Sequence, residues 1–365
     1  MVSLNAVRES NSQITSLFPE GASGLVAVFA GATSGIGEST MKHFAKHVKK
    51  PKAYFLGRNE NAGSRITTEL KTICPEGDFT FIKVDLSLIT NVDEVCTQIK
   101  SQEAHINVLF LTSGVIGLEK KGCSHTAAFW GTSLTAYLDT SEGLEKIAAI
   151  SLYSRIRLMQ NFLPHLQQAS PALARIVNVF SGAKGGACYE NDLAGRTLSP
   201  LKHRTATATM TTMAMEHLAV QAPEVSFLHM FPGFVRTANQ DQPGMLFALI
   251  RGIMYVFGRW ICVSLEESGE RNLFHCTSAK YPPKVYRSLE DDPASNHAVV
   301  AGVPLSNGTP VAEASEGSQG KGIYLINWDG EIMPENPLFA EYRATGMKEK
   351  IWRHIEEEFK RIVNV

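Results

Sequence analysis

The chain lacks a strong charge of either sign, a paired cysteine motif and a long uninterrupted apolar run. Its 365 residues include 35 Lys or Arg and 36 Asp or Glu, which leaves a net charge of −1 at pH 7. A nucleic-acid partner requires an excess of basic residues, so the composition predicts none. The six cysteines form no Cys-x-x-Cys pair, so we expect no metal site, and reduced thiols in a cytoplasmic protein.

Two further absences concern membranes. The first twenty residues contain no long apolar core, so we expect an ordered N-terminal arm and no secretory signal. The segment Gly244–Cys262 is very apolar, but Arg251 and Arg259 interrupt it, and charged side chains are costly inside a bilayer. We expect a helix that covers a substrate there, and the alternative is attachment to a membrane surface.

The segment Leu25–Phe44 organises the rest of the chain. An apolar run from Leu25 to Ala30 leads into Gly31, Gly35 and Gly37, and a helical pattern of apolar residues follows. Glycine lets the backbone turn tightly beside a pyrophosphate, and a helix N-terminus offers unpaired N–H groups to it. This strand, turn and helix therefore predict a dinucleotide site.

The spacing of these glycines is Gly-x-x-x-Gly-x-Gly, which resembles the cofactor loop of the short-chain dehydrogenase/reductase family. The resemblance covers roughly Gly24–Thr237. Within Ser141–Gln168, the runs EGLEK and YSR resemble a fungal sub-group linked to secondary metabolism, and so does Ser264–Ser278. The resemblance implies that the loop binds the cofactor through Gly31, Thr33, Ser34, Gly35, Ile36 and Gly37.

The choice of cofactor depends on the residue that follows the second strand. An acid there favours NAD, whereas this chain has Arg58 and Asn59, and a guanidinium can pair with a 2′-phosphate. We therefore predict NADP(H). The resemblance implies further cofactor contacts at strand ends, namely Asp85, Leu86, Ser113, Gly114, Pro232, Gly233, Val235 and Thr237. Asp85 has an alternative role as the N-cap of the helix that starts near Leu88.

The catalytic residues that the resemblance implies are only partly present. Ser181 matches the family's serine, while Ser151 stands where the family has an asparagine. The Tyr-x-x-x-Lys pair is missing, because its positions fall at Ser199 and His203. Three alternatives stay open. Tyr189, His203 or Lys202 supplies the proton; the substrate needs no strong acid; or the reaction is not a redox reaction.

The order of elements predicts an α/β fold with a Rossmann-type, doubly wound, mostly parallel seven-stranded sheet and helices on both faces. We expect one domain, with an arm (1–20), a cofactor-binding core (21–237), a substrate lid region (238–290), a flexible loop (291–322), and the last strand with a C-terminal helix (323–365). The strands are expected at Leu25–Ala30, Lys52–Arg58, Phe79–Val84, Ile106–Thr112, Arg175–Ser181, Val225–Phe231 and Gly322–Trp328. Helices are expected at Ser141–Gln168, Arg204–Val220, Ser264–Ser278 and Lys348–Val363.

These observations predict an enzyme, an NADPH-dependent reductase of an apolar ketone, imine or unsaturated intermediate in a fungal secondary-metabolite pathway. The alternatives are a cyclase or isomerase that uses the same cleft without hydride transfer, and a non-catalytic binding protein. The partner is a small apolar molecule. The family commonly pairs through its two long central helices, so the assembly that the resemblance implies is a homodimer.

Overall fold

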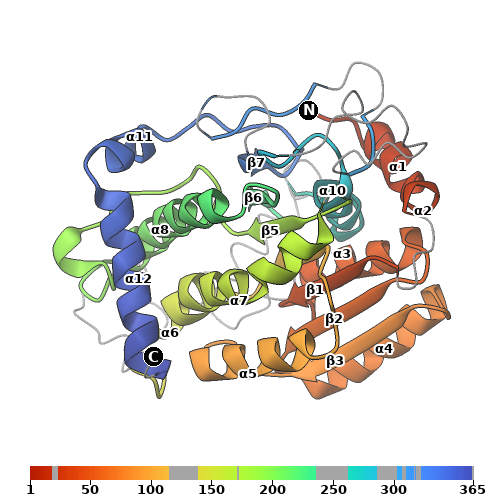
Figure 1. Cartoon of the computed structure of the whole chain (residues 1–365), viewed down its shortest axis with the longest axis horizontal. Helices are drawn as coiled ribbons and strands as arrows, with labels where there is room; N and C mark the ends of the chain where they lie inside the picture. Colours follow the sequence, from red (N-terminus) through yellow and green to blue (C-terminus); the bar gives the residue numbers. More distant parts are fainter. Residues whose placement is uncertain are drawn as a thin grey trace.

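A computed structural model describes residues 1–18, 24–114, 139–170, 172–235, 262–285, 302–305, 310–315, 317 and 322–363. Seven parallel strands form one sheet in the order β3-β2-β1-β4-β5-β6-β7 (Figure 1). The strands are β1 (Val26–Ala30), β2 (Lys52–Gly57), β3 (Asp78–Lys83), β4 (Val108–Leu111), β5 (Arg175–Val179), β6 (Ser226–Phe231) and β7 (Ile323–Asn327). The predicted doubly wound sheet is therefore confirmed.

Burial on both faces explains why the central strands are continuous apolar runs. Successive side chains of β1 point to opposite faces of the sheet. Val26 and Val28 join one buried cluster with helices α5, α7, α8 and α12, while Ala27 and Phe29 join a second cluster with α1, α3, α4 and α10. The sheet thus separates two hydrophobic cores.

The helices on these two faces have the following bounds. The first face carries α5 (Ile89–Lys100), α6 (Lys146–Ala148), the π-helical turn η1 (Ala149–Tyr153), α7 (Ser154–Ala169), α8 (Pro200–Gln221), α11 (Pro337–Ala344) and α12 (Met347–Val363). The second face carries α1 (Leu4–Ser12), α2 (Ile14–Leu17), α3 (Gly35–His47), α4 (Glu60–Ile73) and α10 (Leu265–Thr277). A short 3₁₀ helix, η2 (Glu190–Asp192), precedes α8.

Two of the expected helices begin at other residues than predicted, which matters for the site. The helix expected from Ser141 begins at Lys146 and passes through η1 before α7. The helix expected from Arg204 begins at Pro200, because proline suits the first helical turn, where its missing N–H costs nothing. The expected helix Ser264–Ser278 is α10, with Ser264 as its N-cap. Val363 ends the C-terminal helix as expected.

Helix α12 crosses the outer faces of α7 and α8 (Figure 1). Its buried residues recur every four positions, at Met347, Ile351, Ile355 and Phe359, so they form one apolar stripe. Tyr153 Oη and His354 Nε2 lie 2.8 Å apart, and the rings of His217 and Trp352 stack with centroids 4.1 Å apart. The chain thus covers its own central helices.

The N-terminal arm is ordered as two short helices, α1 and α2, packed beside α10. Residues 236–261, which include Thr237 and most of Gly244–Cys262, lie outside the described residues, as do residues 286–290 of the expected lid region and residues 291–301, 306–309, 316 and 318–321 of the expected flexible loop. No helix in the described part of the chain combines the length and apolarity needed to span a bilayer.

Candidate cofactor and active site

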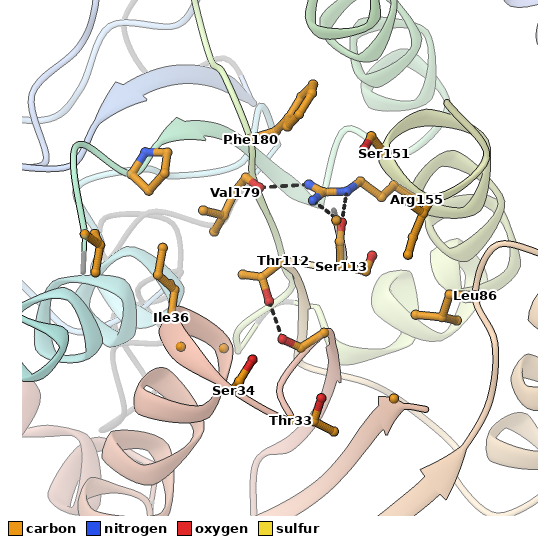
Figure 2. A pocket seen from close by; sticks show the side chains of 18 of the residues that line it. Thr33, Ser34, Ile36, Leu86, Thr112, Ser113, Ser151, Arg155, Val179 and Phe180 are labelled. Carbon is orange, nitrogen blue, oxygen red and sulfur yellow. Dashed lines mark hydrogen bonds between the residues drawn. The ribbon is translucent and has the colours of Figure 1, made fainter. Parts of the chain in front are cut away.

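A cleft of about 500 Å³ opens where the strand order reverses between β1 and β4. Ligands of doubly wound sheets bind in this crevice, outside the carboxyl ends of the strands. The lining comes from the ends of all six strands from β1 to β6, from the start of α3, and from η1, α7 and α8. The cleft therefore gathers segments that are far apart in the sequence (Figure 2).

The glycine loop forms one wall of the cleft, through Gly31, Thr33, Ser34, Gly35, Ile36 and Gly37. Gly31 has a φ of 88°, and a Cβ there would lie 2.4 Å from the backbone N of Ser113. A Cβ on Gly37 would lie 2.6 Å from the carbonyl oxygen of Gly31. Ser34, the N-cap of α3, makes no capping side-chain bond, so the first N–H groups of α3 are left for an anion.

Thr112 fixes this loop against the end of β4. Its Oγ1 donates to the carbonyl oxygen of Gly31 at 3.0 Å (Figure 2), with a second contact to Ala30 O at 3.2 Å. The next two residues, Ser113 and Gly114, also line the cleft, as predicted from their place after the strand. A threonine hydroxyl therefore holds the loop where the related family usually has an asparagine.

The end of β2 supplies the positive charge that the sequence predicted beside the loop. Arg58 is exposed and lines both the main cleft and an adjoining pocket. Among the described residues its guanidinium has no hydrogen-bond or ion-pair partner. Asn59 points elsewhere, because its side chain caps α4 by accepting from Ala62 N at 3.0 Å.

Asp85 and Leu86 follow β3 as expected, and they take different places. Leu86 lines the main cleft, and Asp85 lines the adjoining pocket beside Arg58. The carboxylate of Asp85 accepts from Ser87 N and Oγ, at 3.0 and 2.8 Å. Asp85 is not the N-cap of α5, so that alternative was wrong: Glu142, distant in sequence, accepts from Ile89 N at 2.6 Å instead.

The segment after β6 closes the far end of the cleft. Pro232, Gly233 and Val235 line it, as does Phe234. Gly233 has a φ of 70°, which lets the chain turn back over the cleft. Thr237, the last residue of the predicted cofactor segment, lies outside the described residues.

Ser181 follows Phe180 after β5, but Ser181 itself is not among the residues that line the cleft. Its side chain is buried, and Arg204 Nη2 lies 3.4 Å from its Oγ. Its backbone N–H donates to His229 Nε2 at 3.4 Å, and the other ring nitrogen, Nδ1, lies 2.9 Å from Thr212 Oγ1. Complete burial lowers the pKa of His229 to about 3, so the ring is neutral at pH 7 and accepts this bond.

Two arginines flank Phe180 at this end of the cleft. Arg155 and Arg204 place their guanidinium carbons 5.4 and 4.8 Å from the centre of the Phe180 ring, a favourable arrangement of cation and aromatic face. All three residues line the cleft. Neither arginine has a carboxylate partner within the part of the chain that the structure describes, so the cleft is positively charged beside Phe180.

Arg155 is completely buried, and neutral oxygens surround its charge. Its guanidinium donates to Ser113 O, to Val179 O at 2.9 Å and to Asn178 Oδ1 at 2.7 Å (Figure 2). Burial, with a smaller contribution from Arg204, lowers the pKa of Arg155 to about 9, so it remains charged at pH 7. One turn before it, Ser151 lines the cleft from η1, and π-helical turns are frequent at functional sites.

The three acids proposed from the sequence are not among the residues that line the cleft. His203 is buried on another side of α8, with its Nε2 3.8 Å from Glu145. Burial lowers the pKa of His203, and the charge of Glu145 opposes this shift. Lys202 is exposed one residue earlier, and Tyr189 is 41% exposed before η2. The side chain that lies beside the Ser181 hydroxyl is instead Arg204.

The sequence prediction missed Arg155, Phe180 and Arg204. Arg155 belongs to the YSR run, which indicated a sub-group but no role. Arg204 follows the two residues chosen as candidate acids, and only the observed start of α8 turns it toward the cleft. A count of cationic residues without acidic neighbours would have found Arg204, since residues 199–209 contain no Asp or Glu.

Comparisons with known proteins agree with this architecture. A family model described as short chain dehydrogenase matches residues 25–243. An oxidoreductase of Emericella nidulans is 36% identical over 98% of this chain and 97% of that protein, and an oxidoreductase of Emericella variicolor is 35% identical over 99% and 98%.

Solved structures share the fold. The L-sorbose reductase of Gluconobacter frateurii, in complex with NADPH and L-sorbose, aligns with a TM-score of 0.50 at 16% identity, over 71% of this chain and 91% of that chain. The family model covers more than half of this chain, and the two fungal relatives match it along almost its whole length. The protein is therefore a member of the short-chain dehydrogenase family and, like its two named fungal relatives, an oxidoreductase.

Proposed function

We propose that this enzyme is an NADPH-dependent reductase of an apolar ketone, imine or unsaturated intermediate in a fungal secondary-metabolite pathway. The observation that carries the proposal is the arrangement of one cleft. Its lining includes the glycine loop, Arg58 and Arg204, and Ser181 Oγ lies 3.4 Å from the Arg204 guanidinium. A dinucleotide phosphate and a polarised substrate group match these three features.

The residues of the cleft fit NADPH. A Cβ on Gly31 or Gly37 would collide with the backbone of Ser113 or of Gly31, so glycine at both positions permits the tight turn that a dinucleotide-binding loop requires. Arg58 would bind a 2′-phosphate through a charge-assisted hydrogen bond. Ser113, Gly114 and Val235 would hold the nicotinamide half. When bound, the cofactor supplies the hydride.

Ser181 and Arg204 are proposed to hold the reacting oxygen or nitrogen of the substrate. Ser181 Oγ can donate to that atom, and the Arg204 guanidinium, 3.4 Å from Oγ, stabilises the negative charge that develops there. An arginine is a poor proton donor because it stays protonated. This pair therefore stabilises charge, whereas the family's Tyr-x-x-x-Lys pair also delivers a proton.

The lining of the cleft supports an apolar substrate body. Ile36, Leu86, Ile150, Val179 and Phe234 line it beside the polar groups. The relatives in Emericella are named as oxidoreductases, which favours reduction over the non-redox cyclase or isomerase considered from the sequence. The fungal relatives and the resemblance to a secondary-metabolism sub-group support the pathway assignment.

The experiment that tests this proposal is a fluorescence titration of the purified protein with NADPH and with NADH, followed by NADPH-dependent reduction of a panel of hydrophobic ketones, imines and enones. The matched variant is Gly37→Val, whose side chain would collide with the Gly31 carbonyl and displace the loop, and circular dichroism verifies that the variant is folded. We expect binding of NADPH by the unmodified protein only. Equal binding by the variant, or no binding of either nucleotide, would overturn the proposal.

A further inference from the structure

A second cluster of ligand-type side chains lies between α3 and α10, which cross side by side (Figure 1). His43 and His47 are four residues apart on one face of α3, and Glu266 and Glu270 are four apart on the facing side of α10. His43 Nδ1 lies 3.4 Å from Glu270 Oε1, and His47 Nε2 lies 3.9 Å from the same oxygen. Two imidazole nitrogens and one carboxylate oxygen therefore lie close together between the two helices.

The two ring nitrogens in this cluster are buried without a hydrogen-bond partner among the described residues. His43 is 4% exposed and Glu270 is 4% exposed. His43 Nδ1 and His47 Nε2 both lack a hydrogen bond, although buried polar groups usually have one. A ligand that accepts lone pairs from both nitrogens and from Glu270 Oε1 would satisfy all three.

The neighbours of these groups orient them. Asn11 Nδ2 donates to the second carboxylate oxygen of Glu270, Oε2, at 2.7 Å, which leaves Oε1 facing the histidines. On the other side of the His43 ring, Nε2 lies 3.5 Å from Glu266 Oε1. Metal-binding histidines characteristically direct their second ring nitrogen toward a carboxylate, and metal-binding carboxylates are themselves hydrogen-bonded.

We propose that His43, His47 and Glu270 bind a divalent transition-metal ion, with zinc as the preferred ion. The three ligand atoms lie within 4.8 Å of one another. Zinc binds nitrogen and oxygen at about 2.0–2.2 Å in a tetrahedron, which separates two ligand atoms by about 3.4 Å. The distance from His43 Nδ1 to Glu270 Oε1 is 3.4 Å, and small side-chain rotations bring His47 to the same spacing.

The position of the site indicates a structural role. His43 lies eight residues beyond Gly35, about 12 Å along the helix from the cofactor loop, so the ion is not at the reacting centre. It would connect α10 and, through Asn11, α1 to the helix whose N-terminus forms the cofactor site. A side chain at Gly269 would lie 2.3 Å from Ser39 Oγ, so the two helices are already in close contact.

The test is isothermal titration of chelator-treated, full-length protein with Zn²⁺, together with absorption spectra of the Co²⁺ form. We expect one ion per chain, a rise in melting temperature on zinc addition, and a tetrahedral Co²⁺ spectrum without a thiolate charge-transfer band. His47→Ala and Glu270→Gln should each weaken binding at least about tenfold. Far-UV circular dichroism verifies that each variant is folded.

His105→Ala is the matched control, because it removes a histidine outside the cluster and should keep full zinc affinity. Absence of zinc binding to the unmodified protein would overturn the proposal. Equal affinity in His47→Ala and the control would also overturn it, as would a thiolate band in the Co²⁺ spectrum, which would assign the ion to cysteines.

Discussion

Arg58 is the side chain that we propose selects the cofactor. It is exposed at the end of β2, lines the cleft, and has no acidic partner among the described residues. We predict that Arg58→Ala weakens NADPH binding about 10- to 100-fold, the loss expected for one charge-assisted hydrogen bond of about 1.5–3 kcal/mol, and leaves NADH binding unchanged. Parallel fluorescence titrations measure this.

Arg353→Ala removes an exposed arginine on α12 and serves as the control for lost charge. If Arg58→Ala lowered the affinity for NADH as much as that for NADPH, the arginine would not be reading the 2′-phosphate.

Arg204 carries the proposed chemistry at the other end of the cleft. We predict that Arg204→Met lowers kcat for substrate reduction about 100- to 1000-fold, the loss seen when one preorganised donor to a developing anion is removed. NADPH binding should remain within about twofold because Arg58 and the glycine loop are unchanged. Steady-state kinetics and fluorescence titration separate the two effects. The prediction would be wrong if Lys202→Met lowered kcat by this factor and Arg204→Met left kcat unchanged. Lys202 would then be the residue that stabilises the developing charge.

The sequence predicted which residues line the cleft where their position follows from the local order of strand and turn. It did not predict the residues whose position depends on how helices pack. Gly31, Gly37 and Ser113 follow strands directly, so their place at the sheet edge follows from strand order alone. Arg204 and Arg155 reach the cleft only because of where α8 begins and because η1 shifts the phase of the helix before α7. One-residue differences in helix phase rotate a side chain by about 100°, which a pattern cannot resolve.

At the scale of elements, Arg155 connects α7 to the ends of β4 and β5. Its guanidinium donates to Ser113 O, Val179 O and Asn178 Oδ1. Arg155→Met would leave these oxygens buried without donors, and each such loss costs about 1–3 kcal/mol. We predict that the free energy of unfolding falls by about 2–4 kcal/mol.

Urea denaturation measures this loss, and Arg155→Lys is the informative companion variant. A single ammonium cannot reach acceptors on both strands, so lysine should recover only part of the stability. If Arg155→Met were as stable as the unmodified protein, the prediction would be wrong. The free energy lost with the hydrogen bonds would then be offset because the variant no longer buries a charge.

Helix α12 changes what the family resemblance implies about assembly. It covers α7 and α8, the two long helices through which the family commonly pairs, with Tyr153 Oη 2.8 Å from His354 Nε2 and stacked rings at His217 and Trp352. We predict that the protein does not dimerise through these helices and is a monomer. Light scattering after size-exclusion chromatography should give a mass near 40.0 kDa, and a mass near twice this value would contradict the prediction.

For the whole molecule, the fold was predictable because the alternation of apolar runs and helical patterns is local information. The position of α12 over α7 and α8 was not predictable from the sequence. The amphipathic pattern of Lys348–Val363 predicts a buried stripe but not its partner, because packing between elements so distant in the chain depends on shapes that no single segment encodes. The convergence of His43, His47 and Glu270 is unpredictable for the same reason.

The stability of the whole molecule should depend on pH through its buried histidines. Burial lowers the pKa of His229 to about 3, and burial with the nearby charges of Arg271 and Arg175 lowers that of His275 to about 3. An unfolded histidine has a pKa of about 6.5. Below that value the unfolded chain therefore binds protons that the folded chain cannot bind until about pH 3, and stability falls as the pH falls through this window.

We predict that each of these histidines lowers the free energy of unfolding by about 2 kcal/mol between pH 7 and pH 5. His275→Gln should remove one such contribution and flatten the pH dependence, since glutamine does not titrate. Urea denaturation at a series of pH values measures the slope for the unmodified protein, for His275→Gln and for His105→Gln, a half-buried surface position that serves as the control. Identical slopes for all three proteins would mean that the folded chain takes up protons at His275 as readily as the unfolded chain, and that this ring is not held neutral by its burial.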